Sequence, residues 1–261
     1  MEGHTTEGTR ALHQMGGRYT AVVSTKTMPR DAFEGIYDLA LAAAYVRAAM
    51  KDAAQKSEQR ENRKIYVPST RHFIRWIRLG LASPDLVHVG GRDILITFED
   101  LVSMRVIAAL RGAGVSFRAI RIAEKSLRDQ TGKKRPFASE ALWTDSSDVF
   151  TKLQEILMAV SRGSQLAFDF MQHYMIALPG LLYEDEMAAS WEPREGVMIH
   201  PEIQFGKSCI KGTRIPTSTV WGLVKGSDEP DTAMVSRVAR SYQVENEDIW
   251  KAVRWEDAIA A

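Results

Sequence analysis

The chain has 261 residues, of which 45% are hydrophobic and 26% charged, a balance typical of a folded protein and unlike that of a disordered one. It contains no run of 18 apolar residues and does not begin with a basic stretch followed by an apolar one, which argues against a membrane span and an export signal and predicts a cytoplasmic protein. Its single cysteine, Cys209, excludes an internal disulfide and a cysteine-based zinc site, so we expect no metal or other cofactor.

The charge is distributed unevenly along the chain. The whole sequence has 34 basic and 33 acidic residues, a net charge of +1. Residues 1–135 carry 23 basic and 14 acidic side chains, or +9, and the remainder carries 11 basic and 19 acidic ones, or −8. This split predicts a basic front half that meets a polyanion and an acidic back half that meets a different partner. Two differently charged solvated surfaces are the alternative.

The front half reads as a leader followed by helices. Residues 1–35 are rich in glycine and lack apolar periodicity, which predicts a flexible leader. The alanine-dense stretch 36–50 predicts a helix, and the charged stretch 51–64 predicts a solvated loop. After Pro68, Ser69 or Thr70 can cap a second helix that runs to about Leu81.

A hairpin and two more helices complete the predicted domain at 36–135. Apolar runs on both sides of Gly90-Gly91 predict a β-hairpin at 86–96. Thr97, followed by two acidic residues, predicts the start of one helix, and Ser116 predicts the start of another that ends near Asp129. Residues 136–196 are expected to be a connecting α/β segment with short strands around 131–150 and a boundary near 190–197.

The last part, 197–261, is expected to form a separate helical module. Residues 197–205 can pair with 208–210 as a small hairpin, and helices are predicted at about 218–225, 231–241 and 246–258. The fold class expected for the whole chain is therefore mainly α with short β-hairpins.

The second helix carries arginines on one face. Arg71, Arg75 and Arg78 recur at spacings of four and three, opposite the apolar side chains. A helix with such a face, followed by a hairpin, has the order of a winged helix-turn-helix, in which the helix reads bases and the wing holds the backbone. A solvated helix face is the alternative. The expected DNA contacts are Lys64, Ser69, Thr70, Arg71, Arg75, Arg78 and Arg92.

The residues around the hairpin resemble MerR-type regulators. The similar segments are Leu95-Ile96-Thr97-Phe98-Glu99-Asp100-Leu101 and Gly114-Val115-Ser116-Phe117-Arg118-Ala119-Ile120. The resemblance covers about residues 36–130 and implies a MerR-like winged helix-turn-helix. The stretch between the first two helices is longer than the tight turn of that family, and its long dimerisation helix with effector-binding cysteines is absent.

A second motif lies in the back half. The segment Ile210-Lys211-Gly212-Thr213-Arg214-Ile215-Pro216, with Ile199-His200-Pro201-Glu202-Ile203 before it, is similar to the C-terminal module of VapB-like antitoxins that carry a MerR-like domain in front. From the residues themselves, we expect positive φ at two glycines, a fixed helix entry at the proline and backbone capping at the threonine. These structural signature residues are Gly206, Gly212, Thr213, Arg214 and Pro216. Arg214 could instead form an ion pair or a phosphate contact.

The resemblance implies an antitoxin of a type II toxin–antitoxin system. Its partners would be operator DNA, bound by a homodimer, and a PIN-like ribonuclease toxin encoded by the adjacent gene. The candidate toxin contacts are Arg214, Glu247, Asp248, Trp250 and Trp255, although core packing is the plain interpretation of the two tryptophans. A stand-alone MerR-like transcriptional regulator with a ligand-sensing or oligomerising C-terminal module is the alternative function.

The sequence offers no compelling catalytic motif. Gly206-Lys207-Ser208 lacks the glycine that a P-loop needs five positions earlier, where Pro201 stands. The six histidines are scattered without metal-ligand spacing, and Cys209 has no histidine motif nearby. We therefore do not expect an enzyme.

Overall fold

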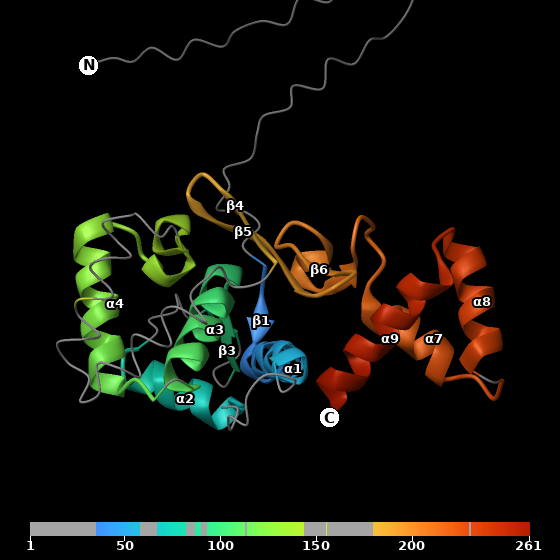
Figure 1. Ribbon diagram of the computed structural model, residues 1–261, viewed down its shortest axis with the longest axis horizontal. Helices are drawn as coiled ribbons and strands as arrows, with labels where there is room; N and C mark the ends of the chain where they lie inside the picture. The colour runs from blue at the N-terminus through green and yellow to red at the C-terminus, as the bar shows by residue number, and fades with distance from the viewer. Residues whose placement is uncertain are drawn as a thin grey trace, which may run out of the picture. The chain divides into compact units, whose positions relative to one another are not determined.

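The protein is described from a computed structural model (Figure 1). The structure describes residues 35–57, 67–81, 87–89, 93–112, 114–143, 155, 180–229 and 231–261. Its fold is mainly α with short antiparallel strands, as the sequence predicts. Two predicted DNA contacts, Lys64 and Arg92, lie outside the described residues, as does the predicted leader up to residue 34.

The first sheet confirms the predicted hairpin and adds a strand. Strands β2 (Val87–Val89) and β3 (Asp93–Ile96) pair antiparallel. A two-residue strand, β1 (Tyr37–Asp38), pairs with the other edge of β3, which gives the order β1-β3-β2. Strand β1 was not predictable from the sequence, because two residues are too few to produce an alternating pattern.

The first helix is longer than predicted. Helix α1 (Leu39–Ser57) continues through residues 51–57, which the sequence analysis assigned to a loop, so that prediction is wrong for this part. Buried alanines such as Ala42 and Ala43 let other elements approach α1 closely. At its polar end Asp52 pairs with Arg194 at 3.2 Å, which gives the charged extension a structural partner.

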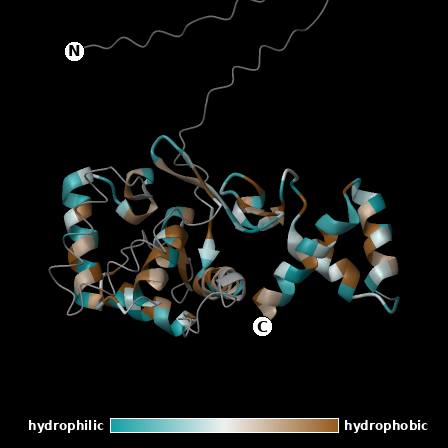
Figure 2. Ribbon diagram, viewed as in Figure 1, coloured by the Kyte–Doolittle hydropathy of each residue, from teal (hydrophilic) through white to brown (hydrophobic). Residues whose placement is uncertain are grey.

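The next three helices begin where their caps predict. Helix α2 (Thr70–Arg78) starts after Ser69, and α3 (Phe98–Gly112) starts after Thr97, whose Oγ1 accepts from the Asp100 N–H. Helix α4 (Phe117–Thr131) is capped by Ser116, whose hydroxyl accepts from the Ala119 N–H at 3.2 Å. Helix α3 is buried along most of its length and is mostly brown in Figure 2.

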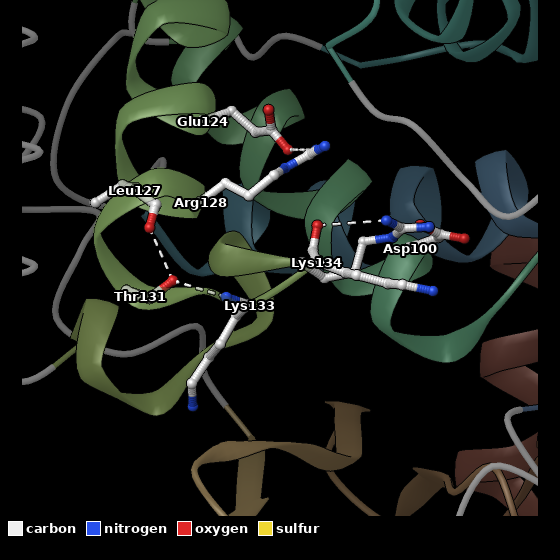
Figure 3. Close-up of polar contacts among 8 residues, drawn as sticks. Asp100, Glu124, Leu127, Arg128, Thr131, Lys133 and Lys134 are labelled. Carbon is white, nitrogen blue, oxygen red and sulfur yellow. Dashed lines mark hydrogen bonds and ion pairs between the residues drawn. The ribbon is translucent and has the colours of Figure 1, made fainter.

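Polar contacts close the end of α4 and lead the chain back. Thr131 Oγ1 donates to the Leu127 carbonyl at 2.8 Å and accepts from the Lys133 N–H at 3.2 Å (Figure 3). Gly132 then adopts a left-handed conformation, φ 68°, which ends the helix. The segment continues as two 3-10 helices, η2 (Pro136–Ala138) and η3 (Glu140–Trp143), where we expected a loop with short strands.

A buried ion pair fastens this returning segment to α3. Arg135 Nε donates to Asp100 Oδ1, and the two side chains are 8% and 0% exposed. The second carboxylate oxygen of Asp100 accepts from the Thr97 N–H at 3.2 Å. Asp100 therefore both caps α3 and neutralises a buried arginine, two roles that only the fold brings together.

The second sheet spans the predicted boundary near residues 190–197. Strands β4 (Leu181–Glu184), β5 (Met187–Arg194), β6 (Val197–Ile199) and β7 (Ser208–Ile210) are antiparallel neighbours in that order. The predicted hairpin of the last part is confirmed as β6 and β7. Because β5 pairs with β6, strands on both sides of the predicted boundary share one sheet.

Three helices follow, close to their predicted positions: α7 (Thr217–Lys225), α8 (Asp231–Tyr242) and α9 (Asn246–Ala260). Apolar side chains of the three helices form a small core with Ile210. A larger core joins α1, α3, α4 and the second sheet, and one residue of α9, Trp255, belongs to it. None of the helices that the structure describes is long and apolar enough to cross a membrane.

Candidate nucleic-acid interface and its junction with the C-terminal module

Helix α2 presents its arginines to solvent. Phe73 and Trp76 are fully buried, which fixes the rotation of the helix about its axis. Arg71, Arg75 and Arg78 are consequently all exposed, as predicted, and we call these three residues the arginine face. Burial of the opposite side therefore settles where the guanidinium groups lie.

The start of α2 is held by a local polar contact. The Ser69 N–H donates to His72 Nδ1 at 3.0 Å, and the Ser69 hydroxyl lies 3.0 Å from the same nitrogen. Ser69 and Thr70 are both partly exposed. The histidine takes the place that a glutamate has in the usual capping box, so no carboxylate lies in the first turn to repel a phosphate.

An aromatic ring brings two more elements to the arginine face. The Arg75 guanidinium lies 5.3 Å from the centre of the Phe117 ring, and that of Arg111 lies 4.1 Å from it. Such cation–π contacts orient a guanidinium while leaving its N–H groups available to other partners. Phe117 thus links the middle of α2, the end of α3 and the start of α4.

The first turns of α4 carry basic residues that the sequence analysis missed. Arg118 and Arg121 are exposed and follow Phe117 directly along the helix. Their spacing of three, the same as that between Arg75 and Arg78, was the signal that could have identified them. They extend the candidate interface from one helix to two.

These cations are not neutralised by any residue that the structure describes. Among the described residues, no ion pair involves the arginine face, Arg118 or Arg121. The next basic residue of α4, Lys125, does bind a carboxylate, Asp129, at 2.6 Å. Unpaired guanidinium groups are available for phosphates or guanine bases, which they can bind through two parallel hydrogen bonds.

A chain of hydroxyl groups joins α1 to the C-terminal module. Tyr45 OH lies 3.1 Å from Ser208 Oγ, which lies 2.7 Å from Thr217 Oγ1. Thr217 Oγ1 in turn donates to Glu256 Oε1, and the Ser208 N–H donates to Tyr45 OH at 3.1 Å. The bonds fit one direction, in which each hydroxyl donates to the next and the carboxylate accepts last. The network connects one residue each from α1, β7, α7 and α9.

Burial raises two pKa values in this network. Desolvation raises the pKa of Glu256, and the hydrogen bonds from Thr217 and Ser208 oppose that change only in part. Desolvation also raises the pKa of Tyr45. Burial therefore favours the protonated phenol of Tyr45. It also makes the Glu256 carboxyl group bind a proton more readily than a solvent-exposed glutamate does.

Trp255, considered above as an exposed partner contact, is fully buried. Its ring lies 5.7 Å from that of Tyr45, within the larger core. The core-packing interpretation of Trp255 is thus confirmed and its candidate role as an exposed partner contact is wrong, because α9 packs on two cores. Trp250 is half-buried and packs against the smaller core.

The other candidate partner contacts on α9 remain near the surface. Glu247 is exposed and binds Arg254 at 2.5 Å, and Asp248 is half-buried. Their carboxylates stand in the first turn of α9, where negative charge is favourable for the helix itself. Glu247 therefore has structural partners in addition to any external one.

The signature residues shape the turn before α7, as expected. Gly206 and Gly212 have φ values of 87° and 77°, and Pro216 precedes the first residue of α7. Thr213 Oγ1 donates to the Ile210 carbonyl at 2.8 Å and accepts from the Ile215 N–H at 3.1 Å. The fifth signature residue, Arg214, is exposed and forms no ion pair with a described residue.

Cys209 lies on β7 beside this turn. It is buried, and burial raises the pKa of its thiol to about 11, although Arg214 and Lys207 partly counter the effect. The thiol donates to the Lys207 carbonyl at 3.5 Å. At neutral pH the group is therefore a neutral thiol and not the thiolate that nucleophilic chemistry needs.

Comparisons with known proteins assign no activity to the chain. Residues 197–255 match a protein family of unknown function, DUF433. The X-ray crystal structure of Rv2018 from Mycobacterium tuberculosis is similar, with a TM-score of 0.58 and 19% sequence identity, over 84% of this chain and 96% of that one. No curated protein matches the chain. The likeness to Rv2018 supports the fold alone.

Proposed function

We propose that this protein is a DNA-binding antitoxin of a type II toxin–antitoxin system. It binds operator DNA as a homodimer in the cytoplasm, represses its own gene, and neutralises a PIN-like ribonuclease toxin through direct contact. The observation that carries the DNA-binding part is the arginine face, whose three guanidinium groups are exposed and form no ion pair within the described residues.

The geometry favours DNA over other polyanions for two reasons. A helix fits the major groove of B-form DNA, and guanidinium groups on its exposed side can then reach base edges and phosphates. The β2–β3 hairpin follows α2 in the chain and pairs with β1 in one sheet, in the order of a winged helix-turn-helix. Arg118 and Arg121 would add phosphate contacts.

The antitoxin part rests on the resemblance of the 199–216 segment to VapB-like antitoxins and on charge. The acidic back half, with a net charge of −8 after residue 135 given its 11 basic and 19 acidic residues, would complement a ribonuclease surface that holds RNA. A partner of that kind explains why one chain combines a basic and an acidic half.

DNA binding is tested with a duplex from upstream of the protein's own gene, measured by fluorescence anisotropy at several salt concentrations. Replacing Arg71, Arg75 and Arg78 by alanine is expected to weaken binding by at least about 100-fold. The matched control replaces Lys225, Arg237 and Arg254, which lower the net charge equally but are paired with carboxylates. Equal losses in both variants would show that only net charge matters and would contradict the proposed interface.

Arg75→Ala alone separates base reading from phosphate binding. If Arg75 contacts a base, its loss should reduce the binding free energy by about 1–3 kcal/mol on the specific duplex only. If Arg75 contacts a phosphate, its loss should weaken binding to all duplexes alike. A plot of log affinity against log salt concentration should then be shallower by about one unit.

Toxin binding is tested by co-expression with the adjacent gene and purification through a tag on this chain. A stable complex, and poor growth when the neighbour is expressed alone, are expected. The Glu247→Gln, Asp248→Asn variant should weaken the complex and leave operator affinity unchanged. An equal loss of DNA binding would refute this division of labour between the halves.

The alternative, a stand-alone MerR-like regulator that senses a small ligand, is favoured by one observation. A cavity of about 490 Å³ opens beside the signature loop of the C-terminal module. If the neighbouring gene proves harmless and no complex forms, a ligand-dependent change in operator affinity would support this second function.

A further inference from the structure

The cavity in the C-terminal module has the size and lining of a small-molecule site. Its volume of about 490 Å³ falls within the range of ligand pockets. Apolar side chains and a few polar ones line it together. The lining residues are Met198, His200, Glu202, Ile203, Cys209, Gly212, Thr213 and Arg214.

Two opposite charges in this lining have no partner within the described chain. Arg214 and Glu202 form no ion pair with each other or with another described residue. Lys211, three residues before Arg214, does bind a carboxylate, that of Glu192, at 2.6 Å. One free cation and one free carboxylate in a single cavity suit a ligand that carries both charges.

The remaining polar groups define what else a ligand can contact. His200 Nδ1 accepts from the Glu202 N–H at 3.1 Å, so the neutral ring carries its proton on Nε2 and has one N–H to donate. The Thr213 hydroxyl is occupied by two backbone partners. Cys209 contributes a neutral thiol, which with Met198 and Ile203 makes an apolar wall.

The turn on one side of the cavity is held in a costly conformation. Gln204 and Phe205 both have left-handed backbones, φ 51° and 56°, at about 1–2 kcal/mol per residue. The Gln204 side chain donates from Nε2 to the Arg214 carbonyl at 3.1 Å. This bond ties the turn to the loop that carries Arg214 and keeps the two sides of the cavity together. Strain of this kind gathers where a fixed geometry serves binding.

We propose that this cavity binds a small apolar zwitterion of the amino-acid class. Arg214 receives the carboxylate, Glu202 receives the ammonium group, the His200 Nε2–H donates a further hydrogen bond, and the side chain of the ligand packs against Met198 and Ile203. The proposal does not depend on the antitoxin assignment, since the site is separate from the arginine face.

The experiment titrates the full-length protein with defined probes, followed by calorimetry or NMR. L-phenylalanine, L-methionine and L-leucine are the zwitterions, 3-phenylpropanoate lacks the ammonium group, and 2-phenylethylamine lacks the carboxylate. At least one amino acid should bind saturably with a Kd of about 1 mM or tighter. If phenylalanine binds, both truncated probes should bind at least tenfold more weakly, because each leaves one protein charge without a partner. For methionine or leucine, the matching des-amino acid and amine are used.

Two conservative variants assign the charges. In Arg214→Gln the amino acid should bind no better than the amine that lacks a carboxylate, and in Glu202→Gln no better than the acid that lacks an ammonium group. Arg214 and Glu202 are both exposed, so the melting temperatures of the two variants should match that of the wild type. Absence of saturable binding by all three amino acids would overturn the proposal. So would binding that neither variant changes.

Discussion

Helix α2 carries three arginines and helices α7–α9 carry five lysines and arginines, and the two regions use these cations differently. On α2 the three arginines are exposed and unpaired among the described residues. On the C-terminal helices, Arg240 forms no ion pair with a described residue, but the other four basic residues each bind a carboxylate. These pairs are Lys225–Asp231, Arg237–Glu229, Lys251–Glu195 and Arg254–Glu247.

The difference shows why a charge count misleads when it is taken alone. A cation that already binds a carboxylate contributes little to the attraction of a distant polyanion, because the fields of the two opposite charges largely cancel at distances much greater than their separation. The two halves therefore differ not only in their number of cations, 23 up to residue 135 and 11 after it, but also, among the described residues, in how many of them remain available.

The largest effect is expected at Arg135, a buried cation of the front half that is paired with Asp100. Arg135→Met leaves the Asp100 carboxylate without its partner at 0% exposure and should cost about 3–5 kcal/mol of unfolding free energy. Arg78→Met, on the arginine face, should change stability by less than about 0.5 kcal/mol while weakening DNA binding. Chemical denaturation measures both. A comparable loss of stability in the two variants would contradict the distinction between structural and available cations.

The next effect lies where the two halves meet. A Cβ added at Gly206 would stand 2.3 Å from Tyr37 OH, and φ there is +87°. Gly206→Ala should therefore cost about 2–4 kcal/mol, combining a left-handed alanine with overpacking. Gly212→Ala is the control: φ is +77°, but the added Cβ meets nothing within 4 Å, so about 1 kcal/mol is expected. Equal costs would mean that the contact with Tyr37 is not close in solution.

A smaller, pH-dependent effect is expected at Glu256. Burial raises its pKa above the ordinary 4.5, so the folded state favours the protonated form. The stabilising contribution is complete below that ordinary value and is lost as the pH rises through the folded-state pKa. Glu256→Gln keeps an acceptor for Thr217 but cannot ionise. The difference in melting temperature, variant minus wild type, should therefore increase as the pH rises from 4.5 to above the folded-state pKa of Glu256. A constant difference across this range would contradict the assignment.

The smallest effect is expected at a paired surface cation. Arg254→Ala removes the ion pair with Glu247, which is largely solvated, and should change stability by less than about 1 kcal/mol. Operator affinity should not change. If this variant weakened DNA binding as much as Arg75→Ala does, pairing would not be what separates the two halves.

Local chemistry was enough to predict most of the helices. Ser116 and Thr97 cap their helices through hydrogen bonds three residues away, and such bonds can be read from a short stretch of sequence. The arginine face followed in the same way, because helical periodicity places its members together whatever the rest of the fold does.

Features that depend on distant residues were not predictable. The charged end of α1 read as a loop because its partner, Arg194, lies far along the chain. Core packing is the plain interpretation of Trp255 from the sequence, but which elements cover it was not predictable, because α9 packs on two cores and one apolar period describes only one of them. The hydroxyl chain from Tyr45 to Glu256 joins residues of unremarkable type from four elements, so nothing in their spacing marks it.

The contact between Trp255 and Tyr45 restricts how the C-terminal module can be inherited. The segment that matches DUF433 contains the tryptophan, whereas the tyrosine that covers it lies outside that segment, on α1. A gene fusion that moved the segment to another protein would expose the Trp255 ring. It would also leave β6 without β5, one of its two neighbouring strands. Such a transfer would succeed only if the new host supplied an equivalent helix, or if the tryptophan were first replaced by a polar residue.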